Sequence, residues 1–250
     1  MTSSESTHFS RDGMTVGLYS AIIHAQILNE RSAIERAYET FPDTSLHWCF
    51  IDLVGSSNFR ILKGSRAGYI RARTFFSIVR TIISYCPDVR LIKEIGDAAF
   101  LCGDFRQLLE CLLLIDHEAF QLRQLTGDER HPFAIRGGIS FGPAKRLLRG
   151  DEDFVGTAID QLARVMGERH STYNLFVHES CSPMDQVLAD YKSFLQVHAP
   201  EMLSASASKG MAKPVYYNWL EVDRSALTEY DRYFIHWREA VERQRSTSKV

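Results

Sequence analysis

Short apolar runs of strand length alternate along the chain with longer stretches in which apolar residues recur every three or four positions. The short runs predict strands, and they cover residues 47–55, 89–103, 133–142, 173–178 and 215–220. The longer stretches predict helices, and they cover residues 14–38, the segment between residues 58 and 86, and residues 104–124, 156–168, 183–197 and 226–244. The alternation indicates one α/β domain with helical extensions at both ends.

The run at residues 89–103 carries the first chemical signal. Gly96 and Asp97 interrupt it and favour a tight turn, so we expect a β-hairpin. Lys93 is a charge inside a run that otherwise looks buried, and a buried charge needs a partner. Asp52 is likewise a single carboxylate in another apolar strand run. Two strands that each carry an aspartate, and that can lie side by side, predict a divalent-metal site.

Composition excludes some classes of function. The 250 residues are 45% hydrophobic and 24% charged, as in an ordinary soluble globular protein, and the net charge of −2 gives no footprint for nucleic acid or an anionic membrane. No apolar stretch reaches the length of a membrane span, and the polar N-terminal residues lack the pattern of a signal peptide. The five cysteines are scattered without a CxxC spacing, so we expect reduced thiols in a cytoplasmic protein.

Several charged positions have ordinary structural explanations when each is taken alone. Aspartate is common in turns, which would explain Asp97. Asp160 and Arg164 are four positions apart on a predicted helix, which is the spacing of a weak surface ion pair. Lys209 in a polar loop would by default be solvated. A purely structural α/β module nevertheless leaves Lys93 and the two strand aspartates without an explanation.

Five segments, in this order along the chain, together resemble the catalytic domain of class III nucleotidyl cyclases. Residues 50–57, Phe-Ile-Asp-Leu-Val-Gly-Ser-Ser, resemble that family's first metal motif, an aspartate followed by a turn into a helix. Residues 92–97 resemble its base-selecting lysine or glutamate and its second metal aspartate, and residues 136–142 resemble its arginine-glycine strand. Residues 153–164 resemble its base-selecting aspartate and the helix that follows, and Lys209 resembles its phosphate-binding lysine.

The resemblance implies a fold and a division of the chain. It implies a ferredoxin-like α/β (α+β) domain whose mixed, mostly antiparallel sheet is covered by helices. The catalytic domain would occupy residues 45–222, after a polar N-terminus and helical lead at residues 1–44 and before a charged C-terminal helix at residues 223–250. The implied enzyme is a lyase that converts a nucleoside triphosphate into a 3′,5′-cyclic mononucleotide and pyrophosphate.

The resemblance assigns Asp52 and Asp97, together with Leu53, to two divalent metal ions, Mg²⁺ or Mn²⁺. Cyclisation of a triphosphate needs such cations, because one ion lowers the pKa of the ribose 3′-hydroxyl and the other bridges the phosphates. On the predicted helix, Arg164 would stabilise the charge that develops at the α-phosphate, and Asp160 would lie beside it.

The remaining assignments concern the base, the phosphates and the oligomer. Lys93 and Asp153 would bind the base, with a structural ion pair as the alternative for these two residues, and Phe50 would limit the depth of the pocket. Contacts to the triphosphate would come from Ser56, Ser57, Lys209 and Arg149. In this family one subunit supplies the metal aspartates and the other supplies the base pair, the arginine and the lysine. We therefore expect a homodimer with shared active sites.

The choice of base rests on a further resemblance. Lys93 with Asp153 matches the adenine-selecting pair of adenylate cyclases, yet the same two side chains can also bond a pyrimidine. The lone catalytic domain and residues 52–57 are similar to the pyrimidine cyclases of bacterial Pycsar anti-phage systems. We expect UTP as the substrate and cyclic UMP as a messenger that alone couples the enzyme to an effector. Cytidylate and adenylate cyclase are the alternatives, and Asp160, where the family usually has asparagine, leaves open an inactive regulatory domain.

Overall fold

The computed structural model describes residue 31 and residues 44–126, 133–146, 154–168, 174–181, 184–211 and 213–247. Most of the predicted N-terminal helix at residues 14–38 therefore lies outside the described residues, as do Arg149 and Asp153. Within the described ranges, no helix has both the length and the apolar character that a membrane span requires.

A mixed sheet forms the centre of the fold, with strands in the order β2-β3-β1-β4-β6-β9-β7. Strands β4 and β6 pair in parallel, and the other neighbouring pairs are antiparallel. The strands are β1 Thr44–Leu53, β2 Val89–Ile95, β3 Ala98–Gly103, β4 Ile135–Arg146, β5 Phe154–Val155, β6 Leu175–His178, β7 Leu195–Val197, β8 Glu201–Met202 and β9 Tyr216–Val222. This sheet confirms the predicted mixed, mostly antiparallel α+β fold.

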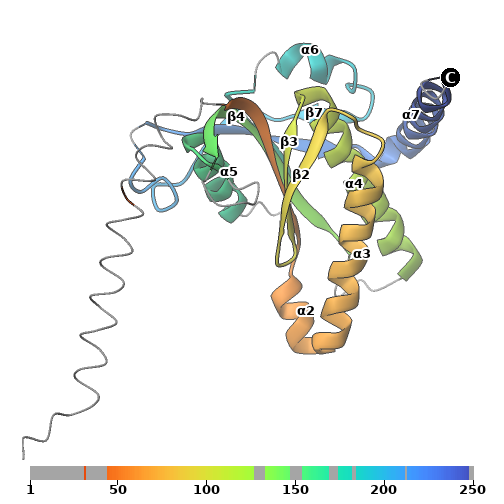
Figure 1. Cartoon of the computed structure of the whole chain (residues 1–250), viewed down its shortest axis with the longest axis horizontal. Helices are drawn as coiled ribbons and strands as arrows, with labels where there is room; N and C mark the ends of the chain where they lie inside the picture. Colours follow the sequence, from red (N-terminus) through yellow and green to blue (C-terminus); the bar gives the residue numbers. More distant parts are fainter. Residues whose placement is uncertain are drawn as a thin grey trace, which may run out of the picture.

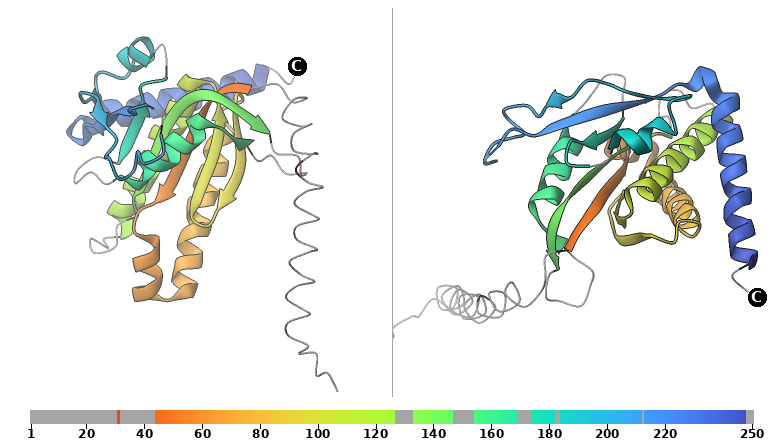
Figure 2. Two further views of the ribbon diagram at one scale, coloured as in Figure 1. Left: turned by 90° about the vertical axis from the view of Figure 1, so that its left-hand side faces the viewer. Right: turned by 90° about the horizontal axis from the view of Figure 1, so that it is seen from above.

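Helices cover both faces of the sheet. Figures 1 and 2 show α3 and α4 on one face, α5 on the other, and α7 alongside α4. The helices are α2 Ser56–Lys63, α3 Ser65–Ile83, α4 Phe105–Thr126, α5 Thr157–Gly167, α6 Met184–Ala189 and α7 Leu227–Thr247, with a short 3₁₀ turn at Arg224–Ala226. The predicted helix between residues 58 and 86 is two helices, because Gly64 adopts a positive φ of 86° between them.

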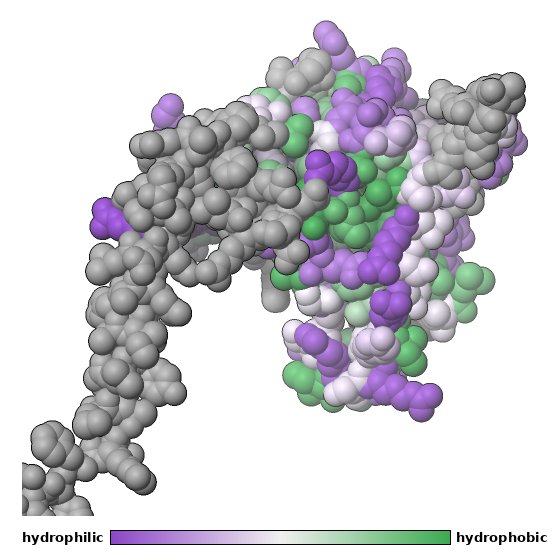
Figure 3. All heavy atoms as spheres, viewed as in Figure 1, coloured by the Kyte–Doolittle hydropathy of each residue, from purple (hydrophilic) through white to green (hydrophobic). Residues whose placement is uncertain are grey.

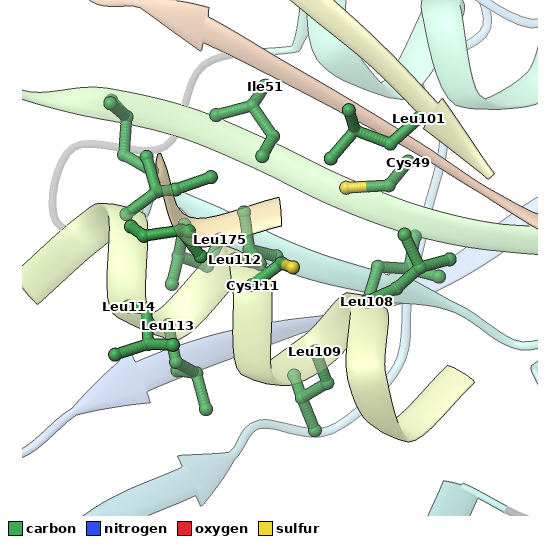
Figure 4. Close-up of a cluster of buried hydrophobic side chains, with 14 of the residues drawn as sticks. Cys49, Ile51, Leu101, Leu108, Leu109, Cys111, Leu112, Leu113, Leu114 and Leu175 are labelled. Carbon is green, nitrogen blue, oxygen red and sulfur yellow. The ribbon is translucent and has the colours of Figure 1, made fainter. Parts of the chain in front are cut away.

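The alternation of side chains along β1 divides the core into two clusters. Cys49, Ile51 and Leu53 point toward α3 and α4, and Figure 4 shows the leucines of α4 packed against the first two. Trp48 and Phe50 point to the opposite face, where they pack with α5. Because Asp52 follows in the same alternation, its side chain lies on the α5 face of the sheet.

Glycine inside a strand favours a bend or a close approach by another group, and in β4 the glycines permit a close approach. A Cβ atom at Gly138 would lie 2.2 Å from the ring of Phe176, and one at Gly137 would lie 2.5 Å from a methyl group of Leu112. Glycine at these two positions lets β6 and α4 pack directly against the strand.

One predicted helix is wrong in its second half. Residues 183–197 contain the short helix α6 and then a turn, after which Leu195 pairs with Val222 as part of strand β7. The apolar spacing of Leu188, Tyr191 and Leu195 is compatible with a helix. The chain leaves the helical path because the edge of β9 offers backbone hydrogen bonds, a tertiary effect that local spacing does not report.

The C-terminal helix is fastened to α4 through the buried Glu110. The carboxylate of Glu110 accepts hydrogen bonds from Tyr191 Oη (2.9 Å), Tyr233 Oη (3.2 Å) and Trp237 Nε1 (3.1 Å). Glu110 is only 8% exposed, so these donors supply the partners that a buried carboxylate requires. The predicted C-terminal helix is thus part of the packed structure.

Candidate active site

Asp52 and Asp97 lie next to each other at the end of β1 and the tip of the β2–β3 hairpin. The backbone N–H of Leu53 donates to the carbonyl oxygen of Asp97 (3.3 Å), which holds the hairpin tip against the end of β1. Burial raises the pKa of Asp52 to about 6, the negative charge of Asp97 adds to the rise, and Arg136 and the Leu53 N–H only partly offset it. The ionised form of Asp52 is therefore disfavoured, mainly by burial, and Arg136 does not fully compensate for this.

Arg136 forms an ion pair with Asp52, and the sequence had given Arg136 no role of its own. It is the cross-strand partner of Asp52 in the β1–β4 register, and its Nη2 lies 3.6 Å from Asp52 Oδ2. Its Nη1 donates to the carbonyl oxygen of Glu168 at the end of α5 (3.2 Å). A charged residue inside an apolar strand was the available signal, as it was for Lys93, but the register that sets Arg136 opposite Asp52 cannot be read from the sequence.

The carboxylate pair has the chemistry of a divalent-metal site. Within the described ranges, no group of three or more His, Cys, Asp or Glu side chains could hold a metal ion unaided. Two aspartates leave the other coordination positions to backbone oxygens, water and substrate phosphates, which is how Mg²⁺ is commonly bound at phosphate-transfer sites. The Leu53 carbonyl oxygen, which accepts a hydrogen bond from Ser56 Oγ (3.0 Å), is the adjacent backbone acceptor. These residues fit the predicted metals.

The loop after Asp52 is shaped to begin a helix. Gly55 has a positive φ of 71° and precedes α2, whose first residues are Ser56, which is buried, and Ser57, which is exposed. The backbone of Val54 is fixed on both sides, by its N–H to Ala134 O (3.0 Å) and by its carbonyl to Arg71 Nη2 (3.0 Å). No side chain caps α2, so its first backbone N–H groups are suited to an anion.

Two aromatic rings lie on the same sheet face as Asp52. Phe50 stacks on Phe100 with ring centroids 4.5 Å apart, and Phe100 is in turn the cross-strand partner of Lys93. Lys93 is half-buried and follows a register shift in β2. The structure therefore sets Lys93 at the end of a short row of side chains that crosses β2, β3 and β1. Its predicted partner Asp153 lies outside the described residues.

The remaining predicted residues cluster around α5. Arg164 Nη1 donates to the carbonyl oxygens of Ala207 (2.6 Å) and Lys209 (2.9 Å), and thereby holds the polar loop against the helix. The side chains of Lys209 and Asp160 are exposed. Glu168 connects this cluster with the carboxylate pair, because its carbonyl binds Arg136 and its Oε1 accepts a hydrogen bond from Ser204 Oγ (2.6 Å).

The fold is that of nucleotidyl cyclase catalytic domains. No family model and no curated protein sequence matches the chain. Solved structures do: the adenylyl cyclase CyaB from P. aeruginosa has a TM-score of 0.57 at 15% identity, over 72% of this chain and 94% of that one. The guanylyl cyclase Cya2 has a TM-score of 0.56 at 12% identity, over 73% and 94%.

The description of a third solved structure names both an adenylate and a guanylate cyclase. This structure is described as an adenylate/guanylate cyclase/hydrolase from Silicibacter pomeroyi, and it has a TM-score of 0.54 at 18% identity, over 72% of this chain and 98% of that one. The chain thus has the class III cyclase fold, and the fold does not distinguish between bases.

Proposed function

We propose that the protein is a nucleotidyl cyclase that converts a nucleoside triphosphate into a 3′,5′-cyclic mononucleotide and pyrophosphate. The observation that carries the proposal is the adjacent pair Asp52 and Asp97, set on β1 and on the hairpin tip of a cyclase fold. Asp52 is half-buried beside a second carboxylate, an arrangement that costs free energy unless a cation compensates it. This cost supports a role for the two carboxylates in holding metal ions for catalysis.

The residues of the chain supply the positioning that the reaction needs. Divalent ions on Asp52, Asp97 and Leu53 would supply positive charge to the triphosphate and acidify the ribose 3′-hydroxyl. The backbone N–H groups that begin α2, at Ser56 and Ser57, are suited to bind the phosphate oxygens. The 3′-oxygen attacks the α-phosphorus in line, the new P–O bond closes the ring, and the bond to the bridging oxygen breaks to release pyrophosphate.

A second copy of the chain would complete each site. In the proposed homodimer Arg164, held by the carbonyls of Ala207 and Lys209, would face the α-phosphate of the partner's nucleotide, with Asp160 nearby. Lys209, whose side chain is exposed, would neutralise the terminal phosphates together with Arg149, and Lys93 with Asp153 would bind the base. Figure 3 supports a partner surface, because apolar side chains gather over the β2–β3 hairpin on the face it shows. One similar structure is itself described as a non-canonical dimeric guanylyl cyclase domain.

We propose UTP as the preferred substrate, and cyclic UMP as a messenger that activates an effector in anti-phage defence. The support is the resemblance of residues 52–57 to the pyrimidine cyclases, together with the row of Lys93, Phe100 and Phe50. The stacked rings would limit the depth available to a base, and the lysine would donate to a uracil carbonyl. Neither feature excludes cytosine.

A product assay tests the proposal. The full chain would be incubated with ATP, GTP, CTP or UTP and with Mn²⁺ or Mg²⁺, and the products resolved by mass, with Asp52→Asn as the inactive control. Cyclic UMP as the main product supports both the activity and the base. Cyclic AMP or cyclic GMP alone supports the activity and overturns the pyrimidine assignment. No cyclic product under any condition overturns the enzyme and favours a regulatory, cyclase-like domain.

A further inference from the structure

The stretch of chain between Asp52 and Asp88 contains no acidic residue. All of its cations belong to α2 and α3, and they are Arg60, Lys63, Arg66, Arg71, Arg73 and Arg80. The net charge of −2 for the whole chain conceals this concentration, because the acidic residues lie elsewhere. At physiological ionic strength, exposed charges more than about 8 Å apart are largely screened from each other. The local charge of these two helices, rather than that of the whole chain, therefore decides what they attract.

Two of these cations are engaged within the protein. Arg71 is buried and donates to the carbonyl oxygen of Val54, and Arg80 forms an ion pair with Glu94 at 2.7 Å. The others are exposed, and they are Arg60 and Lys63 in the last turn of α2 and Arg66 and Arg73 on α3. The exposed cations therefore lie within about three helical turns of Gly64, where α2 ends and α3 begins.

Large apolar side chains are exposed among these cations. On α2, Ile61 is 80% exposed and Leu62 is 63% exposed. On α3, the exposed side chains at positions 66, 69, 70 and 73 share one helical face, and in order they are Arg66, Tyr69, Ile70 and Arg73. Single exposed apolar residues are ordinary, but a group of them set among cations indicates a contact surface.

The end formed by residues 60–73, which we call the α2–α3 tip, is convex. Figures 1 and 2 show α2 and α3 extending past the ends of the strands, with their connection at the far end. Figure 3 shows hydrophobic and hydrophilic side chains side by side there. The two helices pack closely, because a Cβ atom at Gly68 would lie 2.2 Å from the side chain of Arg60. The tip is thus a projecting, well-packed element that suits a broad surface better than a narrow groove.

The residue types at the tip favour a lipid surface over other occupants. Nucleic-acid surfaces combine cations with aromatic rings on which bases stack, whereas Ile61, Leu62 and Ile70 are aliphatic. A symmetric contact with a second copy would set the same cations against each other. At a membrane interface, by contrast, aliphatic side chains enter the acyl boundary, tyrosine lies at the level of the headgroups, and cations attract anionic lipids.

We propose that the α2–α3 tip binds the surface of a membrane that contains anionic lipids. The exposed cations bind the headgroup phosphates, and Ile61 and Leu62 enter the boundary between headgroups and acyl chains. This surface is distinct from the proposed phosphate-binding residues Ser56 and Ser57, which begin α2. The eight residues of α2 span about 12 Å, so lipid at the tip would hold the nucleotide site close to the membrane.

Co-sedimentation of the full-length protein with vesicles tests the proposal without any nucleotide. One set of vesicles is phosphatidylcholine alone, and the other contains about one phosphatidylglycerol for every three phosphatidylcholines. At about 0.15 M salt we expect partitioning onto the anionic vesicles to be at least about tenfold stronger, and about 0.5 M salt should release the protein. Equal partitioning onto the two sets, or none onto the anionic set, would overturn the proposal.

Substitutions of charge locate the contact. Each cation near an anionic surface strengthens partitioning about fivefold, so the double variant Arg66→Gln, Arg73→Gln should weaken it about 25-fold. Its matched control is the double variant Lys192→Gln, Arg232→Gln, which removes two exposed cations from other parts of the fold and should change partitioning little. Equal losses in the two double variants would show that binding follows the overall charge, and would overturn the assignment to the tip.

Substitutions of apolar side chains test insertion. Leu62→Gln keeps a good helix former in α2 but removes an apolar contact, so partitioning should fall at least about fivefold. Met202→Gln, at an exposed position of β8, is its matched control and should have no effect. If the variants of the tip instead weaken binding of a single-stranded RNA oligonucleotide, or change the mass of the assembly in solution, the occupant is a nucleic acid or a second copy, and the lipid assignment is wrong.

Discussion

Replacing Asp52 by asparagine should abolish activity and, in the absence of metal, make the folded protein more stable. The pKa of Asp52 is raised from 3.8 to about 6 by its burial and by the charge of Asp97. The difference between these pKa values corresponds to about 3 kcal/mol of unfavourable free energy for the carboxylate. The Asp52 side chain is 27% exposed, so solvent screening reduces this figure, and we expect a gain of about 1–2 kcal/mol from the neutral amide.

The dependence of this gain on pH follows from the direction of the pKa shift. Because the folded pKa is the higher one, the folded state binds the proton more tightly than the unfolded state does. The cost of the Asp52 carboxylate is therefore complete above pH 6, declines as the pH falls, and is absent below the unfolded value of 3.8. Asparagine should show its advantage at pH 7.5 and lose it near pH 4.

Thermal unfolding in a chelating buffer measures the effect. At pH 7.5 the midpoint of the Asp52→Asn variant should rise by about 2–8 °C, given about 2–4 °C per kcal/mol for a chain of this size. Mn²⁺ should raise the midpoint of the native protein but not that of the variant. Glu179→Gln, which neutralises an exposed carboxylate, should leave the midpoint unchanged. A lower midpoint for Asp52→Asn would mean that its ion pair with Arg136 stabilises the fold, and would refute the reasoning.

Three further predictions concern the scaffold. Gly138→Ala places a Cβ atom 2.2 Å from the Phe176 ring, so the free energy of unfolding measured with denaturant should fall by about 1–3 kcal/mol. In the control Gly167→Ala the new Cβ atom meets no atom within 4 Å, so stability should not change, and equal effects of the two substitutions would contradict the packing. Glu110→Gln weakens three hydrogen bonds to a buried carboxylate, so the free energy of unfolding should fall by about 1–3 kcal/mol, and the backbone amides of α7 should exchange hydrogen with solvent faster. Unchanged hydrogen exchange in α7 would show that Glu110 does not hold this helix against α4. Burial lowers the pKa of His178 in the folded protein to about 4, below its unfolded value of 6.5. The full stability is therefore present above pH 6.5 and should decline by up to about 3 kcal/mol as the pH falls toward 4, because the unfolded state takes up the proton first. The His178→Asn variant should show a smaller decline, and a pH profile identical to that of the native protein would exclude His178 as its source.

Local sequence signals predicted those parts of the fold that local chemistry determines. Gly96 and Asp97 between two apolar runs predicted the hairpin, and it forms with Gly96 at a positive φ of 65°. Glycine inside a strand favours a bend or a close approach by another group, and in β4 Phe176 and Leu112 occupy the space that side chains would need. In both cases the backbone requirement of one or two residues is visible in the sequence.

Features that depend on pairing between distant segments were not visible. Strand β7 was taken for a helix because its pairing with β9 is a tertiary contact. Arg136 was not recognised as the partner of Asp52, because the β1–β4 register sets opposite each other two residues that are far apart in the chain. The predicted roles of Lys93, Arg164 and Lys209 stay predictions, since they depend on a nucleotide and on a second copy of the chain.

The most direct test of a cyclase site shared by two copies is complementation between two inactive variants. Asp52→Asn and Arg164→Ala chains would be co-expressed with different tags, and the mixed dimer would be purified through both tags. Such a dimer contains one site with neither substitution, so it should form cyclic nucleotide at about half the native rate, whereas each variant alone should be inactive. A mixed dimer as inactive as the two variants would contradict the proposed site.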